Sequence, residues 1–266
     1  MKQFLLGAAL PALFLTLFIQ GAAAGPSDAI NTLILSRPDI RFVLFGEMHG
    51  TKEEPQIFGD VVEAMTRQHR PVVAALELEP GTLDSWLASD GGTKARQKLM
   101  AQDDFNSGDG RGSRAMFALI YRLKTLSQNN KNLNVAVIKP AQAGGTSYEK
   151  TMAANIQAAG KGGALVLVLV GNAHNMRVPL PSEPGYPGYD PMAMHMPATE
   201  TLSIGFVTAG GDAWNCQATC GIHPLRADPV PPGQQLIVLK QPHQPYDVLL
   251  PVGKVSASPP MSKSTP

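Results

Sequence analysis

The run ALVLVLV, at residues 164–170, is the feature that most constrains the fold of this chain. It carries no polar residue, which is typical of a strand that is buried on both faces of a sheet. Other apolar runs precede it, and helical patterns separate them. Strands of this kind that alternate with helices form a parallel sheet with helices on both faces. The sequence therefore predicts an α/β fold around a mostly parallel central sheet.

The predicted elements alternate along most of the chain. Strands are expected at residues 41–45, 72–79, 133–138 and 164–170, and helices at 57–70, 81–100, 114–126 and 148–159. A long loop rich in proline and glycine follows residue 170. Three further strands are expected near residues 201–208, 235–240 and 247–251, with no strong helix between them. These C-terminal strands are expected to close the sheet as antiparallel edge strands or to form a small hairpin layer.

The first 24 residues are predicted to be a secretory signal peptide, because a basic start precedes an apolar run and the small residues Ala22–Ala24. The apolar part spans about 16 residues, which is short for a bilayer that needs roughly 20. An uncleaved anchor is the alternative. No cysteine follows the run, so a lipid tether is not expected. The protein is predicted to be secreted or periplasmic, with no stable membrane anchor after cleavage.

The remaining chain is predicted to form one domain. Residues 25–252 suit a single α/β domain, and the composition of residues 253–266 predicts a disordered tail. The net charge is +1, from 22 basic and 21 acidic residues, and this balance argues against nucleic acid as a partner. In an exported chain the close pair Cys216 and Cys220 is predicted to form a disulfide that pins a short loop. A metal-binding or redox pair is the alternative.

Two predicted strands end in the same local pattern, Gly-x-x-His. The strand at residues 41–45 runs into Gly46 and His49, and the strand at residues 164–170 runs into Gly171 and His174. Ligands of open parallel sheets bind beyond the carboxyl ends of the strands. One such pattern alone is typical of a turn with a structural histidine. Two at the same offset predict that both histidines reach one site.

Charged residues at other strand and loop ends extend this predicted site. Glu77 and Glu79 alternate on the strand at residues 72–79, and a carboxylate in an apolar strand needs a partner or a strand end. Arg114 or Arg111 would face these carboxylates or a substrate oxyanion. Glu47 belongs to the site with His49. The nearby pair Glu53–Glu54 is expected to occupy the first turn of a helix. Four histidines are left out of the site: His69, His195, His223 and His243.

The segments GEMHGTKEE, LELE, DGRGSRAM and ALVLVLVGNAHNMR together resemble the superfamily of erythromycin esterases, ChaN-like haem-binding lipoproteins and TraB/Tiki proteins. The resemblance covers roughly residues 40–177 and is closest in motif to the ChaN-like group. It implies an α/β fold with the polar cluster at the carboxyl edge of the sheet. Members include esterases, metal-dependent peptidases and ligand binders, so the resemblance alone does not assign an activity. This chain lacks the lipid-attachment cysteine of ChaN-like proteins.

The preferred functional hypothesis is a hydrolase that acts on a small-molecule or peptide substrate through an activated water. His49 would be the general base, oriented by Glu47, and His174 a second base. Glu77 would join the cluster, and Arg114 would hold a carboxylate or an oxyanion. No G-x-S-x-G nucleophile motif is present. In a metal-assisted version, a divalent metal would be bound by His49, His174 and a carboxylate, with Glu47 preferred over Glu77 or Glu79.

The alternative hypothesis is a binding protein for haem without catalysis. Tyr186 and Tyr189 lie in the proline- and glycine-rich loop, and the methionine-rich segment MAMHM follows at residues 192–196. Tyrosine, histidine and methionine can all be axial ligands of haem iron. A flexible loop with an apolar contact face explains the same residues without a ligand. A non-catalytic interaction domain is the third possibility.

Overall fold

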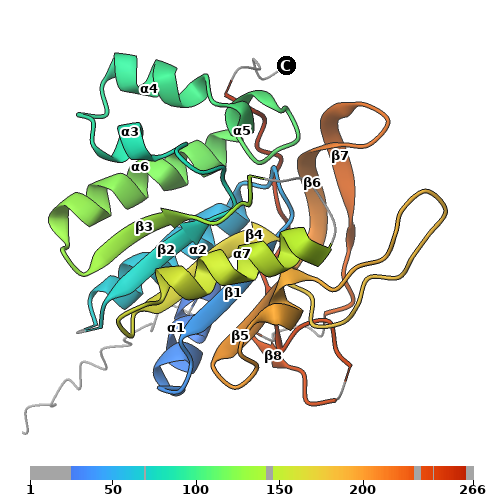
Figure 1. The fold of residues 1–266 in the computed structure, drawn as a ribbon. Coiled ribbons are helices and arrows are strands. Elements are labelled where there is room, and N and C mark those ends of the chain that lie inside the picture. Colours follow the sequence, from blue (N-terminus) through green and yellow to red (C-terminus); the bar gives the residue numbers. More distant parts are fainter. Residues whose placement is uncertain (1–24, 69, 142–145, 231–234, 242, 262–266) are drawn as a thin grey trace, which may run out of the picture.

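The structure is a computed structural model that describes residues 25–68, 70–141, 146–230, 235–241 and 243–261 of the 266-residue chain (Figure 1). The predicted signal peptide and His69 lie outside these residues. Within the described part, none of the helices has the length and apolarity needed to cross a membrane.

A mostly parallel sheet of seven strands forms the centre of the fold, as the apolar runs predict (Figure 1). Its order is β3-β2-β4-β1-β5-β9-β8. The strands span Phe42–Glu47 (β1), Val72–Leu76 (β2), Leu133–Val137 (β3), Leu165–Gly171 (β4), Thr201–Val207 (β5), Ile237–Val238 (β8) and Val248–Pro251 (β9). Only β8 runs antiparallel to its neighbour, whereas β5 and β9 join the sheet in parallel. The expected antiparallel edge is therefore this single short strand.

The alternation of leucine and valine in β4 divides the interior into two cores. Its three leucines pack in one hydrophobic cluster, and its three valines pack in a second cluster on the opposite face. Successive side chains of a strand point to opposite faces, so this strand is buried on both sides. The apolar run at residues 164–170 thus accounts for the three-layer architecture.

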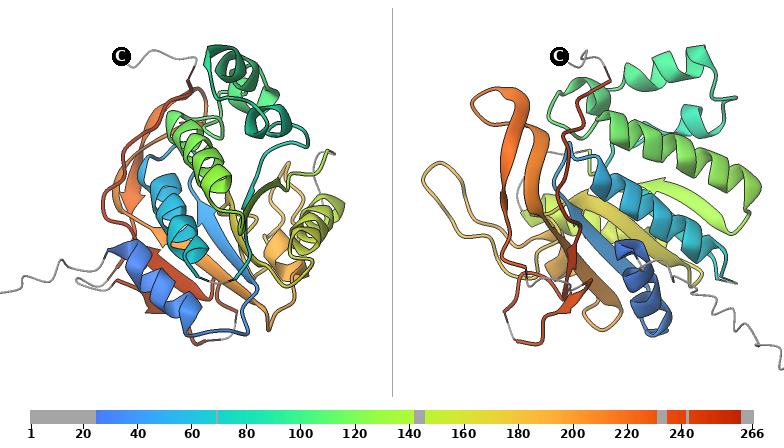
Figure 2. Two further views of the ribbon diagram at one scale, coloured as in Figure 1. Left: turned by 90° about the vertical axis from the view of Figure 1, so that its left-hand side faces the viewer. Right: turned by 180° about the vertical axis from the view of Figure 1, so that it is seen from behind.

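Helices cover both faces of the sheet, as Figure 2 shows. The first core contains apolar residues of α1, α2 and α6, and the second contains those of α7 and the 3-10 helix η1. The helices span Pro26–Leu35 (α1), Glu53–Thr66 (α2), Asp84–Leu87 (α3), Thr93–Met100 (α4), Asp103–Asn106 (α5), Arg114–Asn129 (α6), Thr146–Ala159 (α7) and Met192–His195 (η1). Sequence reasoning missed α1.

A separate two-stranded antiparallel hairpin follows β5. Its strands are β6 (Ala209–Cys216) and β7 (Cys220–Ala227), and the predicted disulfide between Cys216 and Cys220 closes its end. Figure 1 shows the hairpin beyond the edge of the central sheet. The sequence predicted the disulfide but not the two strands that carry it.

The C-terminal segment differs from the prediction of a disordered tail. Residues 253–261 run along the molecule, with Val255 and Ser258 only 3% and 5% exposed. The backbone of this segment bonds to the loop after β1, where Ser258 N–H donates to Gly50 O over 2.7 Å. At the start of α6, Arg114 N–H donates to Pro259 O over 2.9 Å. Backbone partners and buried side chains hold a segment whose composition alone predicts disorder.

Candidate active site

The carboxyl ends of three neighbouring strands meet at one edge of the sheet. Strand β4 lies between β2 and β1, and Glu47 at the end of β1 pairs in register with Gly171 at the end of β4. Glu77 follows β2 directly, and its N–H donates to Leu169 O in β4. The parallel topology therefore brings residues that are distant in sequence to one place.

The corner after β1 places His49 against a buried carboxylate. Glu47 is 2% exposed, and its Oε1 lies 3.1 Å from His49 Nδ1. The other ring nitrogen, Nε2, lies 3.7 Å from Glu77 Oε2. An ionised carboxylate only accepts hydrogen bonds, so Nδ1 is the donor to Glu47. This contact fixes the imidazole so that Nε2 faces Glu77.

The corner after β4 repeats this arrangement with a carboxylate from α7. His174 Nδ1 lies 2.8 Å from Glu149 Oε1, and Glu149 is 2% exposed. The second oxygen of Glu149 accepts the Met192 N–H over 2.8 Å. His174 Nε2 lies 3.7 Å from Glu77 Oε1. The Nε2 atoms of the two histidines therefore face one carboxylate, that of Glu77. The Nδ1 atom of each histidine contacts a different carboxylate, Glu47 or Glu149.

Glu77 is the centre of the cluster and is itself buried, at 6% exposed. Its Oε2 accepts the Gly171 N–H over 2.7 Å. Arg111 Nη1 lies 3.8 Å from Glu77 Oε1. Three nitrogens thus approach this carboxylate at distances that are too long for a direct hydrogen bond. Polar contacts of this length are often bridged by water.

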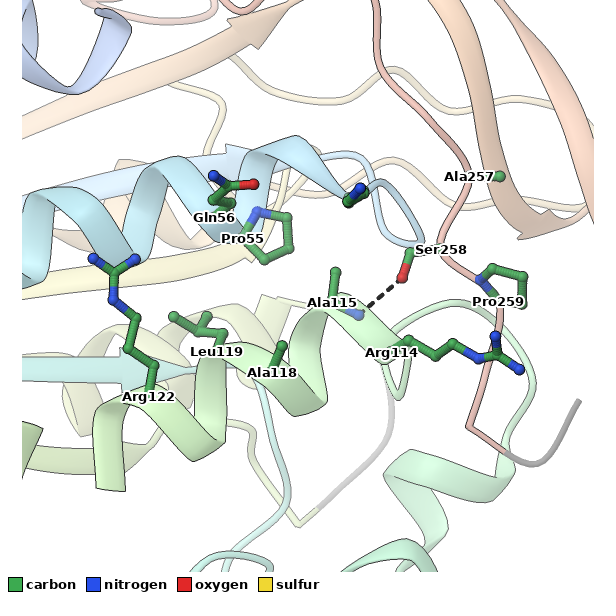
Figure 3. A pocket seen from close by; sticks show the side chains of 11 residues that line it. Pro55, Gln56, Arg114, Ala115, Ala118, Leu119, Arg122, Ala257, Ser258 and Pro259 are labelled. Atoms are coloured by element: carbon green, nitrogen blue, oxygen red, sulfur yellow. Dashed lines mark hydrogen bonds between the residues drawn. The ribbon is translucent and has the colours of Figure 1, made fainter. Parts of the chain in front are cut away.

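Arg111, rather than Arg114, is the arginine of the site. Its guanidinium is held by Asp109, which accepts from Arg111 Nε over 2.9 Å. Arg114 instead lies at a different cavity of about 490 Å³ between α2, α6 and the C-terminal segment (Figure 3). Arg111 belongs to the loop before α6, whereas Arg114 is the first residue of the helix. Of the two arginines that the sequence offered, Arg111 is therefore the one whose contact with Glu77 the structure shows.

Glu79 lies outside the cluster, although alternation placed it on the same face as Glu77. Strand β2 ends at Leu76, so the pleat on which this expectation rested does not continue. Glu79 pairs with Lys139 over 2.8 Å instead. Of the two glutamates that start α2, Glu53 accepts the Ser256 N–H. Glu54 is buried and accepts the Met48 N–H over 2.6 Å, so it supports the corner next to His49.

The charges of the cluster favour two protonated histidines. Burial opposes the charged form of His49 most strongly, but the hydrogen bond and charge of Glu47 and the charge of Glu77 outweigh it and raise the pKa of His49 to about 9. The pKa of His174 is raised as well, because Glu149 and Glu77 outweigh its burial. Burial opposes ionisation of Glu77, yet His49 and His174 hold its pKa below the ordinary value. The site therefore favours the ionised form of Glu77 and the protonated forms of the two histidines that face it.

The cluster opens into a cavity of about 290 Å³. Both histidines line it, and they are 24% and 21% exposed at their side chains. Gly171 also lines it, and a Cβ at this position would stand 3.0 Å from His49 Nε2. The cavity wall also includes Asp109 and, from the β6–β7 hairpin, Cys216. Both histidines and Glu47 can therefore be reached from the cavity, whereas Glu149 is not among the residues that line it.

The predicted metal ligand set of His49, His174 and Glu47 does not converge. Glu47 lies on the Nδ1 side of His49, away from the nitrogen that faces His174 and Glu77. Within the described residues, no group of three or more His, Cys, Asp or Glu side chains is placed to hold a metal ion.

The residues proposed for haem binding are mostly engaged elsewhere. The rings of Tyr186 and Tyr189 contact each other, with centroids 5.9 Å apart. The pKa of Tyr189 is raised, chiefly by burial, which disfavours the tyrosinate form. Met192 is fully buried and packs in the core against α7. Met192 and Met196 of the methionine-rich segment are thus part of the core, whereas Met194 is 38% exposed.

Two site residues had no part in the sequence predictions, Glu149 and Asp109. Glu149 lies on the same face of α7 as the buried residues Met152, Ala153 and Ile156. A carboxylate in the apolar stripe of a helix needs a buried partner, and this signal could have identified it. Asp109 lies in a glycine-rich loop with several other polar residues, and nothing in its local sequence sets it apart.

No protein-family model and no curated protein matches the chain. Among solved structures, a succinoglycan biosynthesis protein is similar, with a TM-score of 0.65 and 11% identity over 88% of this chain and 94% of that chain. A protein from Bacillus cereus has a TM-score of 0.58 and 12% identity over 90% of this chain and 95% of that chain. At these identities the likeness shows a shared fold and no more.

The haem-bound ChaN of Campylobacter jejuni gives a TM-score of only 0.38, with 10% identity over 66% of this chain and 85% of that chain. That value is too low to support an argument about the fold. The resemblance to the esterase, ChaN and Tiki superfamily therefore still rests on the sequence motifs.

Proposed function

We propose that this protein is an exported hydrolase that cleaves an ester or amide bond with an activated water. The observation that carries the proposal is the convergence of His49 and His174 on Glu77, with a buried carboxylate behind each histidine. Carboxylates that orient histidines in this way are typical of acid–base sites. The cavity that both histidines line provides room for a substrate.

In the proposed reaction, Glu77 is the base. Its carboxylate is ionised, and Oε1 does not share the Gly171 N–H, which goes to Oε2. Glu77 accepts a proton from water while the water oxygen bonds to the carbonyl carbon of the substrate. The bond to the leaving group then breaks, and the leaving group takes a proton. Ester or amide and water thus give an acid and an alcohol or amine.

The cations around Glu77 supply the complementary groups. The imidazolium groups of His49 and His174 donate protons or hydrogen bonds to the carbonyl oxygen and the leaving group. Arg111, held by Asp109, adds a positive charge where negative charge develops. The raised pKa of His49 supports this donor role at neutral pH, in place of the general-base role that the sequence suggested.

Substitution of the central carboxylate tests this proposal. The purified protein is assayed against chromogenic esters and fluorogenic peptides. Glu77→Gln is expected to lower turnover by about 10²-fold or more, because an amide cannot accept the proton of water. Glu79→Gln is the matched control, since Glu79 pairs with Lys139 outside the site, and it should keep the wild-type rate. If the wild type hydrolyses a substrate and Glu77→Gln hydrolyses it at the same rate, this mechanism is ruled out.

A further inference from the structure

The β6–β7 hairpin forms one wall of the proposed active site. Asn215 and Cys216, at the end of β6, line the same cavity as His49 and His174. They are separated from both histidines by long stretches of sequence and belong to the separate two-stranded sheet. The hairpin is therefore an independent element placed against the site.

Trp214 joins the hairpin to the loops next to the site. Its backbone N–H donates to Gly50 O over 3.0 Å, and its indole Nε1–H donates to Gly108 O over 2.9 Å. Its carbonyl oxygen occupies the space in which a Cβ of Gly50 or Gly110 would stand, at 1.9 Å and 2.4 Å. Both glycines also have positive φ angles, so no other residue is readily accommodated at either position.

These contacts join the two chain segments that carry the catalytic groups. Gly50 follows His49 directly, and Gly108 and Gly110 flank Asp109, the residue that holds Arg111. A shift of Trp214 would therefore move two backbone segments together: the one at Gly50, next to His49, and the loop that carries Arg111. Catalytic groups need placement within a fraction of an ångström, so such a shift would lower turnover.

The disulfide holds the end of this hairpin next to Trp214. Cys216 pairs directly with Cys220 across the turn, and both residues are exposed. Cys216 Sγ also lies 3.6 Å from Gly108 O. A thiol in solution can therefore reach a bond that restrains the wall of the cavity.

We propose that the disulfide-closed hairpin positions the active site through Trp214, and that a dithiol reductant lowers activity by opening the Cys216–Cys220 bond. This inference rests on the proposed function for its activity readout. Trp214 is a positioning residue, because it touches the segments that carry His49 and Arg111 and not the substrate.

The redox step is ordinary thiol–disulfide exchange. A thiolate of the dithiol attacks one cysteine sulfur, and the Cys216–Cys220 bond breaks as a mixed disulfide forms. The second thiol of the reductant then closes on the first and releases the protein cysteine. The hairpin gains two electrons and two protons, and the dithiol becomes its cyclic disulfide. Reoxidation reverses the step.

Reduction with dithiothreitol tests the inference in two independent ways. Turnover is expected to fall about fivefold, in line with the loss of one positioning hydrogen bond, and to return after oxidation. The backbone amides of residues 47–50 and 107–111 are expected to exchange hydrogen faster in the reduced wild-type protein, while those of β4 do not change. The exchange measurement needs no substrate, so it decides the inference even if the hydrolase proposal fails.

Two variants complete the design. The double variant Cys216→Ser/Cys220→Ser should behave like the reduced protein and should not respond to dithiothreitol. Trp214→Phe keeps an aromatic ring but loses the donor to Gly108 O, and it should lower kcat about fivefold with little change in KM. Unchanged exchange at residues 47–50 and 107–111 after complete reduction would overturn the inference, whatever the activity shows.

Discussion

His49 is subject to two opposing influences that decide its role. Its imidazole lies within the protein, which disfavours a charge, yet Glu47 contacts one nitrogen and Glu77 faces the other. Both nitrogens therefore face acceptors, and a neutral ring could satisfy only one of them. The protonated form presents an N–H to Glu47 and an N–H toward Glu77. This local arrangement makes His49 a proton donor in the resting site.

The pH dependence of turnover is the first prediction at this scale. His49 donates only while it is protonated, so turnover is expected to stay high below pH 9 and to fall as the pH rises through about 9. On the acid side, the lowered pKa of Glu77 should keep turnover high until the pH is below the ordinary value of 4.5. The measurement is kcat/KM as a function of pH with a substrate that does not titrate.

The variant Glu47→Gln provides the control for this profile. Glu47 contributes the strongest influences that raise the pKa of His49, so the alkaline limb should move to lower pH in the variant. A turnover that rises toward pH 9 would contradict the donor role and would make His49 the general base.

The sequence predicted the site residues only where a local pattern marked them. The two Gly-x-x-His corners and Glu77 stand at strand ends, and topology alone brings strand ends together. The choice between Arg111 and Arg114 depends on where α6 begins and how the preceding loop turns. Two arginines three positions apart cannot be distinguished by composition, so this choice required the structure.

At the scale of single elements, α7 supplies the support for His174. Glu149 stands in its buried stripe and accepts from both His174 Nδ1 and the Met192 N–H. The helix thus presents a carboxylate to the site from the opposite face of the sheet to α2. Its apolar neighbours fix the position of this carboxylate by packing against β4.

Glu149→Gln is the prediction that belongs to α7. Glutamine has one acceptor oxygen in place of two and no charge, so His174 should lose its fixed orientation and its raised pKa. Turnover is expected to fall about 10²-fold with little change in the folded structure, as circular dichroism would show. Lys150→Gln, at the exposed neighbouring position, is the matched control. A variant that retains full turnover would show that α7 has no part in catalysis.

Strand positions were predictable where both faces of the strand are buried, but strand directions were not. The runs that form β1, β2 and β4 are buried throughout and apolar except for Glu47 at the end of β1. In contrast, β6 and β7 mix glycine, cysteine and charged residues and are only partly buried. Such a hairpin carries little hydrophobic periodicity. The sequence also contains no signal for direction, which is why β5 and β9 were expected to be antiparallel.

At the scale of the whole molecule, the C-terminal segment connects parts that are distant in sequence. Its backbone bonds to Gly50 after β1, to Lys52 before α2 and to Arg114 at the start of α6. The side chain of Ser258 accepts the Ala115 N–H over 2.8 Å. The segment therefore holds the His49 corner and the first turn of α6 in one arrangement (Figure 3).

Removal of residues 254–266 is the last prediction, and it tests this role. The truncation exposes the groups that Val255 and Ser258 cover and leaves several backbone bonds without partners. Loss of a buried valine and of such bonds corresponds to about 3 kcal/mol of unfolding free energy. The melting temperature should therefore fall by roughly 6–12 °C in a thermal scan. Val255→Ala should give a smaller decrease, and a truncated protein that melts at the wild-type temperature would show that the segment does not stabilise the fold.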